Sequence, residues 1–164
     1  MTESAAPDAR WTVLSRHCEA AVADLKLAVW LWDEHRAAME GADMSARALQ
    51  KSLQKALQDG YASIEAAALY VLSLAREPRP EGPRWHEDLM VQVTAPGSAR
   101  PGFASRLERD LHELRRFRHI AMHGYATFEV DRAEPSVRAA RLVSAGLAAA
   151  AEEFGRGFGL LSPR

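Results

Sequence analysis

The chain lacks the features of disulfide-stapled, secreted or membrane proteins. It contains a single cysteine, Cys18, so no disulfide can form within the chain. Cys18 continues the apolar spacing of a predicted helix, and we expect a buried thiol there. No run approaches the about 20 apolar residues that a membrane span requires, and the acidic start does not resemble a signal peptide. We therefore expect a soluble, cytoplasmic protein with no membrane association.

Charge of one sign is not in excess either. The chain carries 21 lysines and arginines against 22 acidic residues, for a formal net charge of −1. This balance argues against a protein that binds nucleic acid through a broad basic surface. A local basic cluster is nevertheless present, because five arginines follow one another closely: Arg106, Arg109, Arg115, Arg116 and Arg118.

Several motifs that carry well-known chemistry are also missing. The chain has no GxxxxGK[ST] phosphate-binding loop, no GxSxG nucleophile turn and no GxGxxG followed by a ribose-binding acid. It also has no internal repeat. Nucleotide hydrolysis and serine hydrolase chemistry therefore have no support in the sequence.

What the chain does contain is typical of a helical bundle. Its 164 residues suit one domain over 1–164, with a loose tail over residues 1–8. Glycines and prolines cluster between segments whose apolar residues recur at helical spacing. We predict an all-α fold, an antiparallel bundle of four main helices and one short helix. The helices are expected at residues 11–41, 45–76, 85–93, 103–123 and 135–161, with an extended connection around 128–130.

Two of these predicted helices carry features that bear on packing. In the first, Leu27, Trp30 and Leu31 lie off the main apolar stripe, so the helix is either central to the bundle or offers a face to a partner. The second is expected to begin with Ser45 as its N-cap and to continue through Asp59-Gly60. The glycine there would permit close packing against another helix, or a bend.

The most informative stretch is the end of the fourth predicted helix. An apolar stripe leads into it, and at about 100° per residue Arg118 falls within roughly 60° of the centre of this stripe. Arg118 should therefore point inward, whereas Arg116 and His119 should point away. Gly124 is placed to end the helix, which makes His123 and Tyr125 terminal residues. Since about 140° separates Arg118 from His123, a shared site requires an unwound last turn or a second copy of the chain.

Structural roles explain each of these residues equally well when it is taken alone. Arg118 could be a partly buried ion-pair member, and His123 could satisfy the free carbonyls at a helix end. Tyr125 could simply fill a gap. Glu65 on the second helix could face the site as an acid or orient Arg118, although a surface role is favoured. His119 and His123 have the i,i+4 spacing that can chelate a metal, but no third ligand is evident, so no metal or other cofactor is expected.

The spacing of Arg118, His123 and Tyr125 resembles the R-x4-H-x-Y signature of HEPN-domain proteins, in particular the HepT-like ribonuclease toxins. The similarity to this family spans roughly residues 45 to 160 and includes three further segments. They are Tyr61-Ala62-Ser63-Ile64-Glu65, Trp85-His86 and Leu114-Arg115-Arg116-Phe117-Arg118-His119. Many relatives carry asparagine after the motif arginine, where this chain has His119.

The resemblance implies a function for the whole constellation. It suggests a metal-independent endoribonuclease, the toxin of a type VII-style toxin–antitoxin pair, acting as a homodimer with a composite site at the interface. Arg118 would stabilise charge on the scissile phosphate and His123 would transfer a proton. Tyr125 would be adenylylated by a minimal nucleotidyltransferase antitoxin. The RNA substrate would be guided by a rim, with Glu65 in support. The rim residues are Arg115, Arg116 and His119. The alternative is an inactive helical module that binds the nucleotidyltransferase or RNA.

Overall fold

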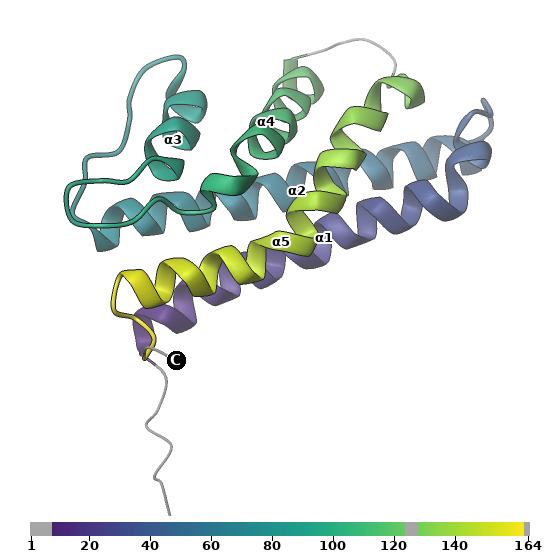
Figure 1. The fold of residues 1–164 in the computed structure, drawn as a ribbon. Coiled ribbons are helices and arrows are strands. Elements are labelled where there is room, and N and C mark those ends of the chain that lie inside the picture. Colours follow the sequence, from purple (N-terminus) through teal and green to yellow (C-terminus); the bar gives the residue numbers. More distant parts are fainter. Residues whose placement is uncertain (1–7, 124–127, 163–164) are drawn as a thin grey trace, which may run out of the picture.

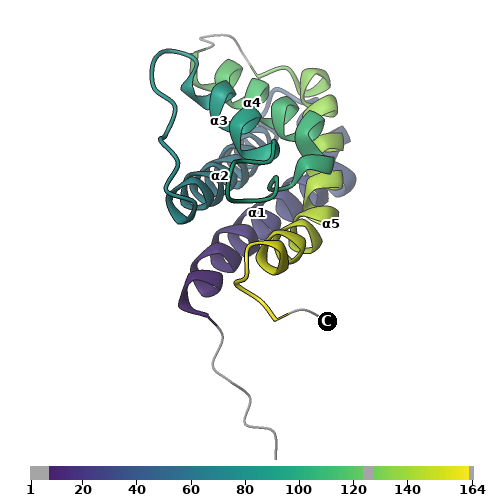
Figure 2. The same cartoon turned by 60° about the vertical axis from the view of Figure 1, so that its left-hand side comes forward.

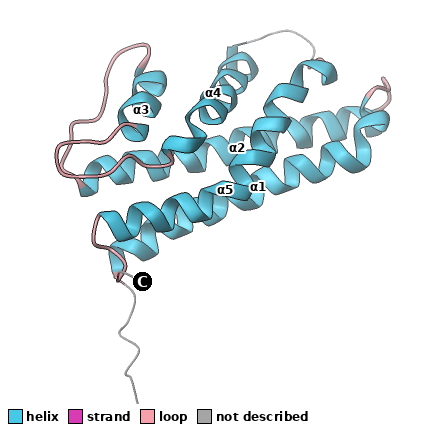
Figure 3. Cartoon of the chain, viewed as in Figure 1, coloured by secondary structure: helices cyan, strands magenta, loops and turns pink. Residues whose placement is uncertain are grey.

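The computed structural model describes residues 8–123 and 128–162, without the side chains of 120–123. Within these ranges the chain forms helices and no strand (Figure 3). The helices are α1 (Ala9–Met39), α2 (Met44–Leu74), α3 (Trp85–Thr94), α4 (Glu108–His123) and α5 (Glu134–Gly157). The prediction of an all-α bundle with four main helices and one short helix is confirmed.

The four long helices surround one core. Helices α1 and α2 lie antiparallel and side by side, and α5 packs along α1 (Figure 1). Helix α4 contacts both α5 and α2, while α3 covers α2 and α4 at one end, as the rotated view also shows (Figure 2). The centre is filled by fully buried side chains that include Leu14, Leu25, Leu57, Ile64, Phe103, Leu111 and Phe154. In the described part of the chain, no helix has both the length and the apolarity needed to cross a membrane.

Aspartates define where the first two helices begin. Asp8 caps α1 by accepting a hydrogen bond from the backbone N–H of Arg10. It was assigned to the N-terminal tail, and the rest of that predicted tail lies outside the described residues. Asp43 caps α2, because its Oδ1 accepts from the backbone N–H of Ala46 at 2.8 Å. The prediction of Ser45 as the N-cap is therefore wrong: a carboxylate two residues earlier satisfies the free N–H groups of the first turn.

Helix α2 continues through Asp59-Gly60, as predicted, and the glycine marks a close approach of two helices. Gly60 is buried against Leu25 of α1, and a Cβ at this position would lie 2.7 Å from Leu25 Cδ2 and 2.8 Å from its Cγ. The absence of a side chain thus lets α1 and α2 approach more closely here. Of the two roles considered for Gly60, close packing is the one observed.

A buried arginine organises the connection between α3 and α4. Arg100 is 5 % exposed and donates hydrogen bonds to the carbonyls of Gln92, Val93, Ala95 and Pro101. Its guanidinium also pairs with Glu77 at 2.8 Å. Arg100 thereby satisfies two of the carbonyls at the end of α3, those of Gln92 and Val93, while the Thr94 carbonyl accepts a hydrogen bond from the Ser105 hydroxyl. The connection is therefore held in a defined path toward α4.

The fourth helix begins later than predicted. Phe103 is buried, but its N–H donates to Val93 at 2.8 Å, and Ala104 then adopts a left-handed backbone with φ of 54°. A short 3₁₀ turn, η1 (Ser105–Leu107), precedes α4, which starts at Glu108. The apolar stripe of this segment is buried as predicted, but the helical hydrogen bonds begin only after Ala104, because its left-handed backbone cannot continue a helix.

The last helix begins as expected and ends earlier. Pro135 lies in the first turn of α5, where its missing N–H has no consequence. The helix ends at Gly157, because Gly159 has φ of 77° and Leu160 N–H turns back to the carbonyl of Gly155. The extended connection expected around 128–130 is confirmed at Glu129, whose backbone is extended with φ of −94° and ψ of 113°. At Val130 the chain already enters a 3₁₀ turn, η2 (Val130–Ala133), so the prediction is wrong for this last residue.

The extra apolar residues of α1 divide between core and surface. Leu31 is buried, whereas Leu27 and Trp30 are 46 % and 52 % exposed. The central position of α1 thus accounts for Leu31, and the other two side chains form an apolar strip on the outside. Cys18 is buried as predicted, and burial raises the pKa of its thiol to about 12.

Candidate functional site

One face of α4 presents three cationic or titratable side chains to a cavity. Arg115, Arg118 and His119 share this face, because steps of three and four residues bring a helix back to nearly the same side. The predicted inward orientation of Arg118 is confirmed: only 28 % of its side chain is exposed. His119 was expected to point away from the core, and it is exposed while also lining the cavity.

Glu65 lies beneath Arg118 and is buried. Its side chain, on α2, is 8 % exposed, so the surface position favoured from the sequence is wrong. Glu65 Oε2 lies 3.6 Å from Arg118 Nε, and Oε1 is hydrogen-bonded to His86 Nδ1. A buried carboxylate is costly unless it is paired, and here both of its oxygens have partners. Of the two other roles considered for Glu65, an acid at the site or an orienting partner of Arg118, these contacts favour the orienting role.

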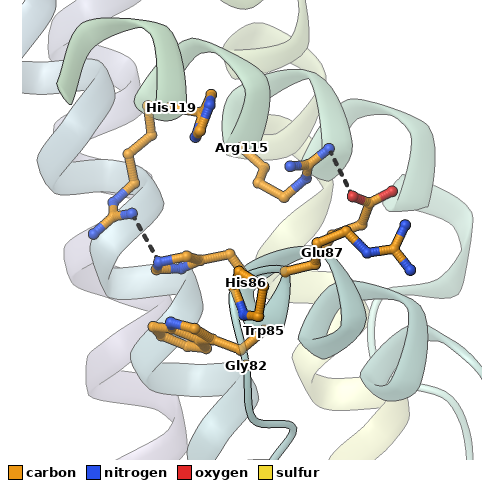
Figure 4. Close-up of a pocket in the computed structure, with 9 residues that line it drawn as sticks. Gly82, Trp85, His86, Glu87, Arg115 and His119 are labelled. Atoms are coloured by element: carbon orange, nitrogen blue, oxygen red, sulfur yellow. Dashed lines mark hydrogen bonds and ion pairs between the residues drawn. The ribbon is translucent and has the colours of Figure 1, made fainter. Parts of the chain in front are cut away.

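His86 completes this group and was assigned no role from the sequence. It is the second residue of α3, and its Nε2 lies 3.2 Å from Arg118 Nη1 (Figure 4). The ring stacks on Trp85 with centroids 3.6 Å apart, and Arg79 lies over the same indole at 5.7 Å. The Trp85-His86 pair formed part of the family likeness. Nothing local in the sequence could connect it to Arg118, which lies 32 positions later and on another helix.

The hydrogen-bond roles in this group follow from the chemistry of arginine. A guanidinium has donors only, so Nε2 of His86 must be the acceptor of the bond with Arg118. The proton of His86 is then on Nδ1 and is donated to Glu65. The result is a chain of contacts from α2 through α3 to α4, in which every partner has a defined role.

Tyr61 lies one helical turn before Glu65 and is completely buried. Burial raises the pKa of its phenol, and the Glu65 carboxylate raises this pKa further, while Arg115 and Arg118 oppose the shift. Within the described residues, the Tyr61 hydroxyl and the buried Nε of Arg115 have no hydrogen-bond partner. Two buried polar atoms, one on an arginine that lines the cavity and one on the tyrosine a helical turn before Glu65, thus form no hydrogen bond with the described residues.

The cavity has a volume of about 620 Å³ and a cationic lining (Figure 4). Its lining residues come from the loop before α3, from α3 and from α4: Gly82, Pro83, Arg84, Trp85, His86, Glu87, Arg115, Arg118 and His119. Glu87 is the acidic member, and it lies 3.8 Å from Arg115. With three arginines against one carboxylate, the lining favours an anionic ligand of the size of a phosphate group and its substituents.

Of the remaining predicted site residues, Arg116 does not line this cavity. The side chain of Arg116 is 61 % exposed on the other side of α4 and pairs with Glu113 at 3.7 Å, so the predicted rim is split. His123 is the last residue of α4, but its side chain lies outside the described residues, as does Tyr125. Among the residues described, no three His, Cys, Asp or Glu side chains are grouped as a metal site would require.

Comparison with known proteins adds one finding. Residues 52–158 match the model of a family described as HepT-like protein, and this segment contains Glu65, His86 and Arg118. The chain matches no curated protein and no solved structure. Because the matched segment is more than half of the chain and the fold is an all-α bundle, the chain belongs to the HepT-like family of HEPN-type proteins.

Proposed function

We propose that this protein is a metal-independent endoribonuclease and the toxin of a type VII-style toxin–antitoxin pair. Membership of the HepT-like family suggests a HEPN-type toxin module. The observation that carries the proposal is the position of Arg118. Its guanidinium lines a cationic cavity while two of its nitrogens are held from behind by Glu65 and His86.

In the proposed reaction the RNA supplies its own nucleophile. The 2′-hydroxyl oxygen forms a bond to the adjacent phosphorus as the bond to the 5′-oxygen of the next nucleotide breaks. The products are a 2′,3′-cyclic phosphate and a 5′-hydroxyl. Arg118 stabilises the charge that develops on the nonbridging oxygens. His123 takes or delivers one of the two protons that move, a task suited to imidazole at neutral pH.

The composite site requires two copies of the chain in this proposal. Arg118 and His123 are separated by about 140° around a regular helix, and α4 is helical from Glu108 to His123. One copy of α4 therefore does not direct both residues to the same point, whereas two copies facing each other in a homodimer can do so. The exposed Leu27 and Trp30 provide apolar area of the kind that interfaces bury.

The proposed partner is a minimal nucleotidyltransferase antitoxin that adenylylates Tyr125. An AMP group attached two residues after His123 would bring a phosphate close to the arginines of the cavity. That phosphate would compete with RNA for the Arg118 guanidinium, and the adenosine would obstruct the entrance. A single modification would thus silence the nuclease.

The second candidate is an inactive HEPN module that binds a nucleotidyltransferase or RNA. Two observations favour it: His119 stands where many relatives have asparagine, and Arg118 already has partners within the chain. In this case the cavity would bind an anionic group without cleaving it. RNA binding without cleavage would distinguish this candidate from the first.

The test is cleavage of RNA by purified wild-type protein and by three alanine variants in buffer containing EDTA. Arg118→Ala and His123→Ala should each lower the rate by about two or more powers of ten, because each removes a group that acts on the transition state. Arg138→Ala is the control, since it removes an exposed arginine of α5 that pairs with Glu134 and has no role in the proposed site. Cleavage that EDTA abolishes, or that survives in both site variants, would contradict the proposal.

Mixing the two inactive variants tests the composite site. If each site takes Arg118 from one protomer and His123 from the other, a mixed dimer contains one intact site. Random exchange should then restore about a quarter of the wild-type activity. Light scattering at micromolar concentration should report a dimer. A monomeric protein, or a mixture with no recovered activity, would exclude a shared site.

A further inference from the structure

Two residues outside the predicted arginine–histidine pair hold the guanidinium of Arg118. Glu65 reaches it from α2, with Oε2 at 3.6 Å from Nε, and His86 reaches it from α3, with Nε2 at 3.2 Å from Nη1. The two residues are also hydrogen-bonded to each other. Three helices that are distant in the sequence thus meet at one closed triangle of side chains.

This triangle restricts a side chain that would otherwise be flexible. A long arginine side chain samples many rotamers, and binding a ligand through it requires that freedom to be lost. Here two contacts restrict the guanidinium before any ligand arrives, and no hydrogen bond among the described residues uses Nη2. The guanidinium of Arg118 is therefore preorganised at the cavity wall, and its Nη2 is available to donate hydrogen bonds to an anion.

Glu65 and His86 themselves are well anchored. The Glu65 side chain is 8 % exposed, so the carboxylate has little freedom to turn away. The His86 ring, 27 % exposed, is stacked on Trp85, whose other neighbour is Arg79. The support for Arg118 is therefore rigid, as a site that must hold a charged group in one place requires.

We propose that Glu65 and His86 are a positioning pair that presets the Arg118 guanidinium to take one phosphate of a phosphodiester in the cavity. The inference deepens the proposed function and rests on it for RNA as the source of that phosphate. The anion preference itself follows from the lining, in which Arg84, Arg115 and Arg118 face the single carboxylate of Glu87.

Two substitutions of His86 separate positioning from a simple space-filling role. An asparagine amide can replace Nδ1 and donate to Glu65, but it does not reach the place of Nε2. A glutamine amide can place its oxygen near Nε2 and accept from Arg118. If His86 positions Arg118, His86→Gln should preserve anion binding and His86→Asn should lose it. If His86 only satisfies Glu65, the asparagine variant should perform as well as the glutamine variant.

The experiment titrates inorganic phosphate at constant ionic strength while the arginine Nε–H signals are followed by NMR. Wild type should bind phosphate with a shift of the Arg118 signal. The affinity should fall by about tenfold or more in His86→Asn, His86→Ala and Glu65→Gln, since small displacements of a positioning group have effects of this size. His86→Gln should stay close to wild type, and Arg138→Ala, at an exposed arginine of α5, is the surface control. Circular dichroism of each variant verifies that the helices are intact.

The same variants are then assayed for RNA cleavage, which keeps the two proposals apart. Suppose that His86→Gln keeps phosphate binding, that His86→Asn loses it, and that no variant or wild-type protein cleaves RNA. This result would support the positioning pair and contradict the proposed nuclease. RNA cleavage with equal phosphate affinities in the two variants would uphold the nuclease and overturn the positioning pair. Absence of phosphate binding by wild type, or tighter binding by His86→Ala, would also overturn it, because Glu65 and His86 would then not be preparing Arg118 for an anion.

Discussion

Replacement of Gly60 by alanine is the sharpest test of how the long helices pack. Gly60 lies inside α2 against Leu25 of α1, and both residues are buried. An added Cβ would lie 2.7 Å from Leu25 Cδ2 and 2.8 Å from Leu25 Cγ. Contacts this short require Leu25 or one of the helices to move. Gly60→Ala should therefore destabilise the protein although alanine is the better helix former.

The expected magnitude is the difference between two opposing effects. Alanine in place of glycine in a helix interior stabilises by about 1 kcal/mol. Overpacking of a filled core typically costs about 1–3 kcal/mol, and we expect about 2–3 kcal/mol here because the fully buried Leu25 has little room to yield. The net loss should be about 1–2 kcal/mol. For a chain of this length that corresponds to a decrease of roughly 2–8 °C in Tm.

Gly146→Ala is the matched control, because Gly146 also lies within a helix, α5. There the added Cβ would meet the side chain of Leu107, with Cδ2 at 3.3 Å, Cδ1 at 3.6 Å and Cγ at 3.9 Å, and this partly exposed side chain can move by the small amount required. The control should thus be neutral or stabilising by up to about 1 kcal/mol. The two substitutions are chemically identical and should have opposite signs.

Urea unfolding followed by circular dichroism measures both changes, and a second background locates the cause. In a Leu25→Ala protein the clashing atoms are absent, so Gly60→Ala should become neutral or stabilising, a coupling that a double-mutant cycle reports. If Gly60→Ala is as stable as wild type, or remains equally harmful without the Leu25 side chain, close packing at this point is not what the glycine provides.

The remaining predictions concern buried groups and the proposed regulation. Arg100→Met should destabilise by about 3–5 kcal/mol, because it leaves the mostly buried Glu77 carboxylate and several carbonyls without their donor; a loss below about 1 kcal/mol in urea unfolding would contradict this. Arg100 lowers the pKa of Glu77, so their ion pair should stabilise at neutral pH and lose its effect as the pH falls through that lowered pKa; Glu77→Gln should flatten the dependence of the unfolding midpoint between about pH 6 and 3. Burial raises the pKa of Cys18 to about 12, so its thiol should resist a disulfide reagent at pH 8 in the folded protein and react after unfolding in urea; rapid reaction of the folded protein would show an accessible thiol. Tyr125→Phe should keep nuclease activity and escape inhibition by the antitoxin. Co-expression with the nucleotidyltransferase, followed by peptide mass spectrometry, checks this. If wild-type Tyr125 carries no AMP and the antitoxin still neutralises the variant fully, the antitoxin inhibits by binding alone.

Local spacing was sufficient to predict the helices and the direction of one key side chain. An apolar stripe at steps of three and four residues is a property of neighbouring positions, and burial of that stripe is what stabilises a helix in a bundle. For the same reason the inward position of Arg118 could be deduced from its angle to the stripe. The continuity of α2 through Gly60 was equally local, because the periodicity on both sides stayed in phase.

Only the tertiary structure decided which residues meet Arg118. Glu65 and His86 lie on α2 and α3, and their contacts with α4 depend on how three helices are packed, which no local pattern encodes. Glu65 was placed at the surface from the sequence because the cost of burying a carboxylate is visible locally, whereas the guanidinium and imidazole that offset it are not. The late start of α4 has a similar origin, since the Phe103 N–H is directed to Val93 by tertiary packing before the helix can begin. The sequence by itself thus determined the helices and the inward arginine, and the packing of those helices determined the site around it.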